Sequence, residues 1–76
     1  MANQKIATIF REIADLLDMS GVAFKPLAYR RAAESLEKLD KEINLVYQEK
    51  GLKGIKEIPG IGQSMEEKIV EYLKDG

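Results

Sequence analysis

The sequence contains no cysteine and no histidine among its 76 residues. Their absence excludes a disulfide framework, a zinc finger and any cysteine–histidine nucleophile pair. No apolar run approaches the roughly 20 residues that a membrane-spanning helix requires. The first turns carry Lys5, Arg11 and Glu12 among apolar residues, which is not the pattern of a secretory signal peptide. We therefore expect a cytoplasmic protein.

The length of the chain restricts the kind of function it can carry. We expect one domain spanning residues 1–76, and a monomer. A chain of this size buries only about 60% of the surface that its unfolded form exposes, which favours a binding surface over an enclosed substrate cavity. The net charge is −1, yet residues 21–41 hold five basic and three acidic side chains. Any contact with phosphate groups would therefore be local.

The spacing of apolar residues predicts helices along the whole chain. Apolar side chains recur at steps of three and four, and no segment alternates with the period of two that a strand requires. The expected helices cover residues 4–18, 26–39, 41–50 and 63–75, and residues 52–57 leave room for one or two further turns. Gly21 and Gly51 are expected to end the first and third helices, and Asp40 to cap the start of the third. The predicted fold is all-α, a compact bundle of four main helices plus one short helix.

The inward faces of these helices follow from the same spacing. The expected core comprises Ile6, Ile9, Phe10, Ile13, Leu16, Leu17, Tyr29, Ala32, Ala33, Leu36, Leu39, Ile43, Val46, Tyr47, Met65, Ile69, Tyr72 and Leu73. Pro26 suits the first turn of the second helix, where its missing N–H group costs nothing.

Residues 58–62, Ile-Pro-Gly-Ile-Gly, form a hairpin between two helices. Glycine reaches backbone angles that are closed to other residues, and without Cβ atoms the backbone can approach a ligand closely. The unpaired N–H groups at the start of the following helix form an anion site. The alternative is an ordinary helix–helix turn that uses glycine. The apolar residues around the glycines favour a turn that binds a phosphate group through its backbone.

The start of the last helix has two interpretations. If Gly62 is the N-cap, the amides of Gly62, Gln63 and Ser64 are available to a phosphate. If Ser64 is the N-cap, Ser64 and Glu67 form a capping box. The first is favoured because phosphate binding requires amides at this point.

Three segments together resemble the N-terminal, 8-kDa helix-hairpin-helix domain of family X DNA polymerases. They are the run Phe-Lys-Pro-Leu-Ala-Tyr-Arg-Arg-Ala-Ala at residues 24–33, the hairpin at 58–62, and Glu-Lys-Ile at 67–69. The resemblance to DNA polymerase beta-like proteins covers nearly the whole chain and is closer to the bacterial and archaeal branch. It implies structure-selective, sequence-independent binding of gapped or nicked DNA in repair, with the polymerase body as a further partner.

The resemblance also implies which residues bind. The 5′-phosphate pocket would use side chains at the start of the second helix, and the hairpin backbone would contact further phosphates. The implied DNA-binding residues are Lys25, Tyr29, Arg30, Gly60, Ile61, Gly62, Gln63 and Ser64. Members of the family often hold a monovalent cation, K⁺ or Na⁺, on hairpin carbonyls, which here belong to Lys56, Ile58 and Ile61. No other cofactor is implied.

Two alternative functions stay open at this point. Some members of the family use a lysine of the last helix as a Schiff-base nucleophile that removes 5′-deoxyribose phosphate, and Lys68 occupies that position. Partial burial of its stem against Tyr72 would favour the neutral amine that this chemistry needs. However, Ser64 stands where lyase members carry a second lysine, and Phe24 replaces the histidine of the vertebrate form. The other alternative is a helical protein–protein module without nucleic acid.

Overall fold

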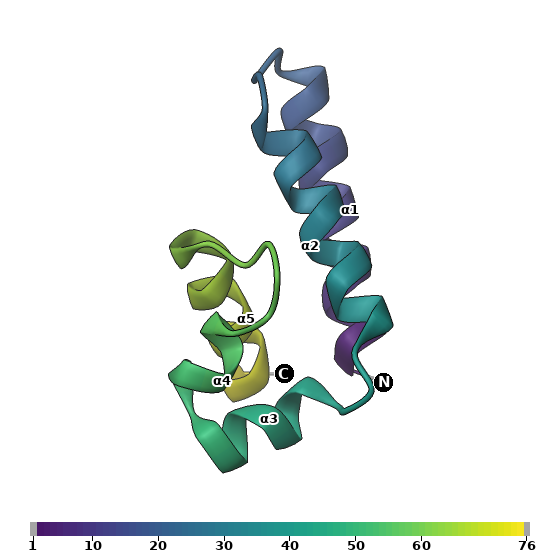
Figure 1. The fold of residues 1–76 in the computed structure, drawn as a ribbon. Coiled ribbons are helices and arrows are strands. Elements are labelled where there is room, and N and C mark those ends of the chain that lie inside the picture. The colour runs from purple at the N-terminus through teal and green to yellow at the C-terminus, as the bar shows by residue number, and fades with distance from the viewer. Residues whose placement is uncertain (1, 76) are drawn as a thin grey trace.

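Five α-helices follow one another in the computed structural model, which describes residues 2–75. They are α1 (Ala2–Met19), α2 (Lys25–Lys38), α3 (Ile43–Lys50), α4 (Leu52–Lys56) and α5 (Gln63–Asp75). Figure 1 shows α1 and α2 as a long antiparallel pair, with α3, α4 and α5 gathered beside one half of it. This confirms the predicted all-α fold of four main helices plus one short helix. Within residues 2–75 no helix is long and apolar enough to cross a membrane.

Small side chains bring α1 and α2 into close contact. Ala7 and Ala14 on α1 and Ala32 on α2 are completely buried. Between these positions, the rings of Phe10 and Tyr29 meet edge to face, with centroids 5.3 Å apart and ring planes at 87°. This is a favourable geometry for two aromatic rings. The inward orientation predicted for Tyr29 is therefore confirmed.

The buried face of α1 differs from the predicted one at two positions. Ile9 is 38% exposed and Leu16 is 63% exposed, although the spacing placed both in the core. The close packing on α2 is centred on Ala7 and Ala14, so this line of the helix takes the buried position. Ile9 and Leu16 lie on a flank of α1 that α2 does not cover.

Asn3, a buried residue of α1, caps the start of α3. Its side-chain Oδ1 accepts a hydrogen bond from the Ile43 N–H at 2.7 Å, and its Nδ2 donates to the Lys41 carbonyl at 2.8 Å. The prediction that Asp40 caps this helix is wrong, because α3 begins at Ile43 with Glu42 as its N-cap residue. A cap supplied by another helix removes the need for a local one.

Glycines end α1 and α3, and another glycine allows α4 to pack on α3. Gly21 and Gly51 have φ values of 76° and 64°, as expected for the residues that end α1 and α3. Gly54 has a different role that the sequence did not indicate. A Cβ atom at Gly54 would lie 2.8 Å from Val46 Cγ1, so only glycine permits this approach of α4 to α3.

Replacing Asn3 by alanine should lower the free energy of unfolding by about 1–3 kcal/mol. The substitution leaves the Ile43 N–H and the Lys41 carbonyl without their partner in a largely buried position. Gln4→Ala, at the neighbouring exposed position, is the matched control and should change stability by less than about 0.5 kcal/mol. Chemical denaturation measures both. Equal stability of the two variants would show that the Asn3 cap does not hold α1 and α3 together.

Candidate nucleic-acid interface

The hairpin at residues 58–62 is a tight turn that leads directly into α5. Gly60 has a φ of 82°, in the left-handed region that favours glycine. The Ile61 N–H donates to the Ile58 carbonyl at 3.3 Å, and the Gly62 carbonyl accepts from the Glu66 N–H at 2.9 Å. Since α5 begins at Gln63, Gly62 is its N-cap residue. The favoured interpretation of this helix start is confirmed.

The hairpin packs against the middle of α2. A Cβ atom at Gly60 would lie 3.9 Å from the Cα and the backbone nitrogen of Ala32, which itself is completely buried. Ile58 is buried before the turn, and Ile61 is partly buried against the core between the two glycines. These two apolar anchors and the small residue on α2 place the start of α5 next to α2.

This packing creates a shallow pocket of about 190 Å³, here called the α2–α5 pocket. Its lining residues are Lys25, Ala28, Tyr29, Gly62, Gln63, Ser64 and Met65. Five of the eight predicted DNA-binding residues therefore come together, although they belong to two segments far apart in the sequence. Gly60 and Ile61 lie in the adjoining hairpin.

The α2–α5 pocket offers hydrogen-bond donors from both of its sides. The N–H groups of Gln63, Ser64 and Met65 donate to no backbone carbonyl within residues 2–75. They stand at the positive end of the α5 dipole, which favours an anion. On the α2 side, the exposed Lys25 and the buried Tyr29 line the pocket. A group with several negatively charged oxygens suits this arrangement.

Arg30, also predicted to bind phosphate, does not line the pocket. Its guanidinium donates to a carboxylate oxygen of Asp18 at 2.7 Å and to one of Asp15 at 3.0 Å. These two hydrogen bonds raise the pKa of Arg30 above its ordinary value. Both aspartates lie on α1, so the sequence around Arg30 gave no sign of them. We expected Arg30 to bind a DNA phosphate, but two carboxylates already neutralise its positive charge.

Phe24 was part of the sequence motif but received no role from it. It is the one non-glycine residue within 2–75 that has a positive φ, at 69°, and its side chain is 89% exposed. It directly precedes Lys25, which lines the α2–α5 pocket. A strained backbone that presents an exposed aromatic ring is typical of a binding site.

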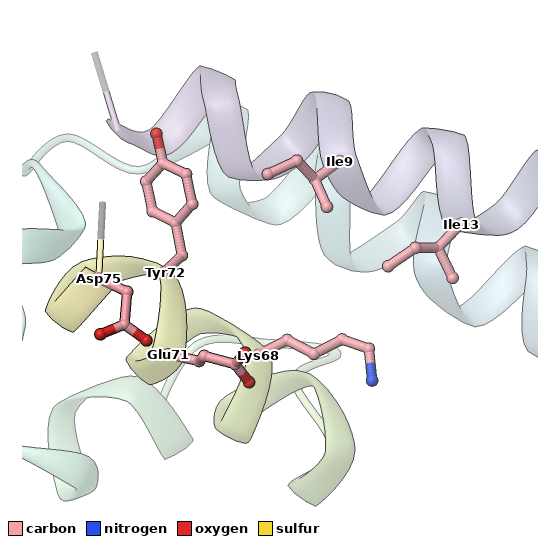
Figure 2. Close-up of a pocket in the computed structure, with 6 residues that line it drawn as sticks. All are labelled: Ile9, Ile13, Lys68, Glu71, Tyr72 and Asp75. Carbon is pink, nitrogen blue, oxygen red and sulfur yellow. The ribbon is translucent and has the colours of Figure 1, made fainter.

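Lys68 does not line this pocket. Figure 2 shows it stretched along α1 near Ile13, in an open groove of about 420 Å³ between α1 and α5. Its Nζ donates to the Ser64 Oγ at 3.3 Å. The side chain is exposed, whereas we expected its stem to be partly buried against Tyr72. The groove between the two helices stays open, so nothing covers the stem.

Comparison with known proteins agrees with this geometry. Residues 1–76 match the family model of the helix-hairpin-helix domain. The chain belongs to this family. No curated protein and no solved structure matches it. Helix-hairpin-helix domains commonly bind DNA, so the family indicates DNA binding in general.

The hairpin carbonyls of this helix-hairpin-helix domain have the capacity to hold a monovalent cation. The carbonyls of Lys56 and Ile61 accept no backbone hydrogen bond outside the helices of residues 2–75, and that of Ile58 accepts one, from Ile61. Each carbonyl oxygen has two lone pairs, and rings of such oxygens replace the hydration shell of K⁺ in other proteins. The three carbonyls therefore fit the cation site that the resemblance implies.

Gly62→Val should separate the role of the hairpin in binding from its role in folding. A Cβ atom at Gly62 would meet nothing within 4 Å, and its φ is not positive, so we expect a loss of about 1 kcal/mol or less. The branched side chain should nevertheless keep a phosphate away from the α5 amides and weaken DNA binding about tenfold or more.

Gly60→Val is the matched variant, in which the same substitution should also lower stability. It should cost at least about 1–2 kcal/mol of stability, since Gly60 has a left-handed backbone. Thermal unfolding and fluorescence anisotropy with 5′-phosphorylated DNA measure the two effects. A folded Gly62→Val protein with unchanged affinity would show that the turn is only structural.

Proposed function

We propose that this domain binds DNA at gaps or nicks, independently of base sequence, by holding phosphates that include the 5′-phosphate. It would do so as the N-terminal domain of a family X DNA polymerase in DNA repair, with the polymerase body as its partner. The observation that carries the proposal is the α2–α5 pocket, where Lys25 faces the free amides of Gln63 and Ser64.

The chemistry of the pocket favours a terminal phosphate over one inside a strand. A terminal phosphate monoester carries close to two negative charges at neutral pH, and a diester carries one. The pocket is lined by one lysine, by Tyr29 and Ser64, and by the amides of a helix start, within about 190 Å³. A strand that ends there can place its phosphate in so small a space, whereas a continuous strand must pass by it.

Selectivity for a gap receives support from Phe24. A gap or nick leaves bases at its edge without a stacking neighbour, and aromatic side chains bind such bases without preference for their identity. The exposed ring of Phe24 stands directly beside Lys25. The bound strand end would therefore have its phosphate in the pocket and an adjacent base against this ring. A K⁺ or Na⁺ ion on the hairpin carbonyls would add a contact to a further phosphate.

Titration with 5′-phosphorylated gapped DNA tests this proposal. We expect the amide signals of Gln63, Ser64 and Met65 and those around Lys25 to shift, with a salt slope, |d log K/d log [salt]|, of about 2–3 for two or three phosphates. The same DNA with a 5′-hydroxyl end, or an intact duplex, should bind at least about tenfold more weakly. Equal affinity for all three would refute the proposal.

Matched lysine variants locate the contact. Lys25→Ala should weaken binding of the 5′-phosphorylated DNA about tenfold, whereas Lys5→Ala should leave it nearly unchanged. Both residues are exposed and neither makes an ion pair within residues 2–75, but only Lys25 lines the pocket.

A second candidate function rests on the position of Lys68. Its Nζ lies 3.3 Å from the Oγ of Ser64, which lines the α2–α5 pocket. A deoxyribose whose 5′-phosphate occupied that pocket would bring its C1′ close to this amine. A 5′-deoxyribose-phosphate lyase using Lys68 is therefore the second candidate. Against it stand the exposure of the side chain, which lacks the burial that we expected for this chemistry, and the absence of a second lysine at Ser64.

Borohydride trapping on a 5′-deoxyribose-phosphate substrate decides whether this chemistry exists. We expect weak or absent trapping by the wild type, and more by Ser64→Lys, because a second cation disfavours the ammonium form of Lys68. Lys68→Ala should remove whatever trapping there is. Strong trapping that survives in Lys68→Ala would exclude this residue as the nucleophile, and no trapping by any of the three would leave a binding domain only.

A further inference from the structure

The acidic residues of α5 differ from most others in having no basic partner. Elsewhere six ion pairs engage the carboxylates of Asp15, Asp18, Glu34, Glu37, Glu49 and Glu57. Within residues 2–75, none of the four carboxylates of α5 makes an ion pair. Glu67, Glu71 and Asp75 also follow each other at four-residue steps, where like charges destabilise a helix.

These carboxylates surround a groove of about 490 Å³ between α4 and α5, here called the α4–α5 groove. Its lining residues are Leu52, Glu66, Glu67, Val70, Glu71, Lys74 and Asp75. Leu52 is 46% exposed and supplies an apolar surface together with Val70. Four carboxylates and one lysine give the groove a formal charge of −3.

Glu66 is the residue that distinguishes this groove from an ordinary acidic surface. It is only 7% exposed, yet its carboxylate makes no hydrogen bond or ion pair to any other residue within 2–75. In that range no fully buried side-chain oxygen lacks a partner, so the Glu66 oxygens reach the groove that the residue lines. Most of the Glu66 side chain is thus shielded from solvent while its unpaired carboxylate faces the groove, so a cationic ligand in the groove would meet a charge that water screens only in part.

The chemistry of the groove identifies the class of its ligand. Among residues 2–75 no three histidine, cysteine, aspartate or glutamate side chains are grouped so as to hold a metal ion. A charge of −3 repels nucleic acid and attracts lysine or arginine, and the apolar surface of Leu52 and Val70 suits an aliphatic side chain. We propose that the α4–α5 groove binds a basic segment of a protein partner, with an apolar side chain between lysines or arginines.

This second surface is independent of the proposed DNA site. The α4–α5 groove and the α2–α5 pocket share no lining residue, so both can be occupied at the same time. A domain that holds DNA in the α2–α5 pocket would thus bind a protein in the α4–α5 groove at the same time, because the two sites attract ligands of opposite charge.

A short synthetic peptide with leucines flanked by lysines and arginines is the probe. We expect it to shift the amide signals of Leu52, Val70 and Lys74 and to leave those of Gln63 and Ser64 in place. A peptide of the same charge with serine for each leucine should bind several-fold more weakly. Binding that shifts no α4–α5 groove residue, or no binding at all, would overturn the proposal.

Two charge-neutralising variants complete the test. Glu66→Gln keeps the shape of the side chain and should weaken peptide binding about tenfold or more, because the basic side chain of the peptide loses a negative charge that is largely shielded from solvent. Glu12→Gln makes the same change in net charge at an exposed position of α1 outside the groove, and should alter affinity less than about twofold. If both variants weakened peptide binding equally, the effect would come from net charge alone, and the α4–α5 groove would not be the binding site. Self-association of the chain that Glu66→Gln abolishes would assign the groove to a second copy instead.

Discussion

The contact between the hairpin and α2 at Ala32 is the constraint on which the rest of the candidate site depends. Gly60 lies against the backbone of α2 there, because a Cβ atom at Gly60 would already be 3.9 Å from the Cα and the backbone nitrogen of Ala32. This approach directs the start of α5 towards the start of α2 and so forms the α2–α5 pocket. A side chain longer than a methyl group at Gly60 would separate the hairpin from α2, and the φ of 82° at Gly60 already favours glycine. The site is thus a consequence of backbone proximity, and its donors are mostly main-chain groups.

Positive and negative side chains line different depressions on the surface of this domain. The net charge of −1 conceals this arrangement. On the side of α2, the two aspartates of α1 hold Arg30, and Lys25 remains as the cation beside the helix start. On the side of α4, the carboxylates of α5 make no ion pair within residues 2–75. One lysine therefore lies where the amides already favour an anion, and four carboxylates lie around apolar residues.

Contacts between neighbouring helices fix the arrangement of α1, α3 and α4 that supports these surfaces. Asn3 connects the first turn of α1 to the start of α3, and Gly54 allows α4 to pack on α3. In a domain with so small a core, each of these contacts represents a considerable part of the total stability. The groove beside Lys68 is open because α1 contacts α5 over only a short length (Figure 2).

The sequence by itself determined the helices, the turn and the chemistry of the turn. Apolar spacing predicted the four main helices, and residues 52–57 left room for the short one. The glycines at 60 and 62 predicted a turn whose following amides are free. These are local properties, since periodicity and backbone preference depend on residues a few positions apart. The tertiary structure alone decided the exposure of Ile9, the partners of Arg30, the cap from Asn3 and the burial of Glu66. Each of these depends on which surfaces of different helices meet, and the spacing within one helix contains no information about the surface that covers it.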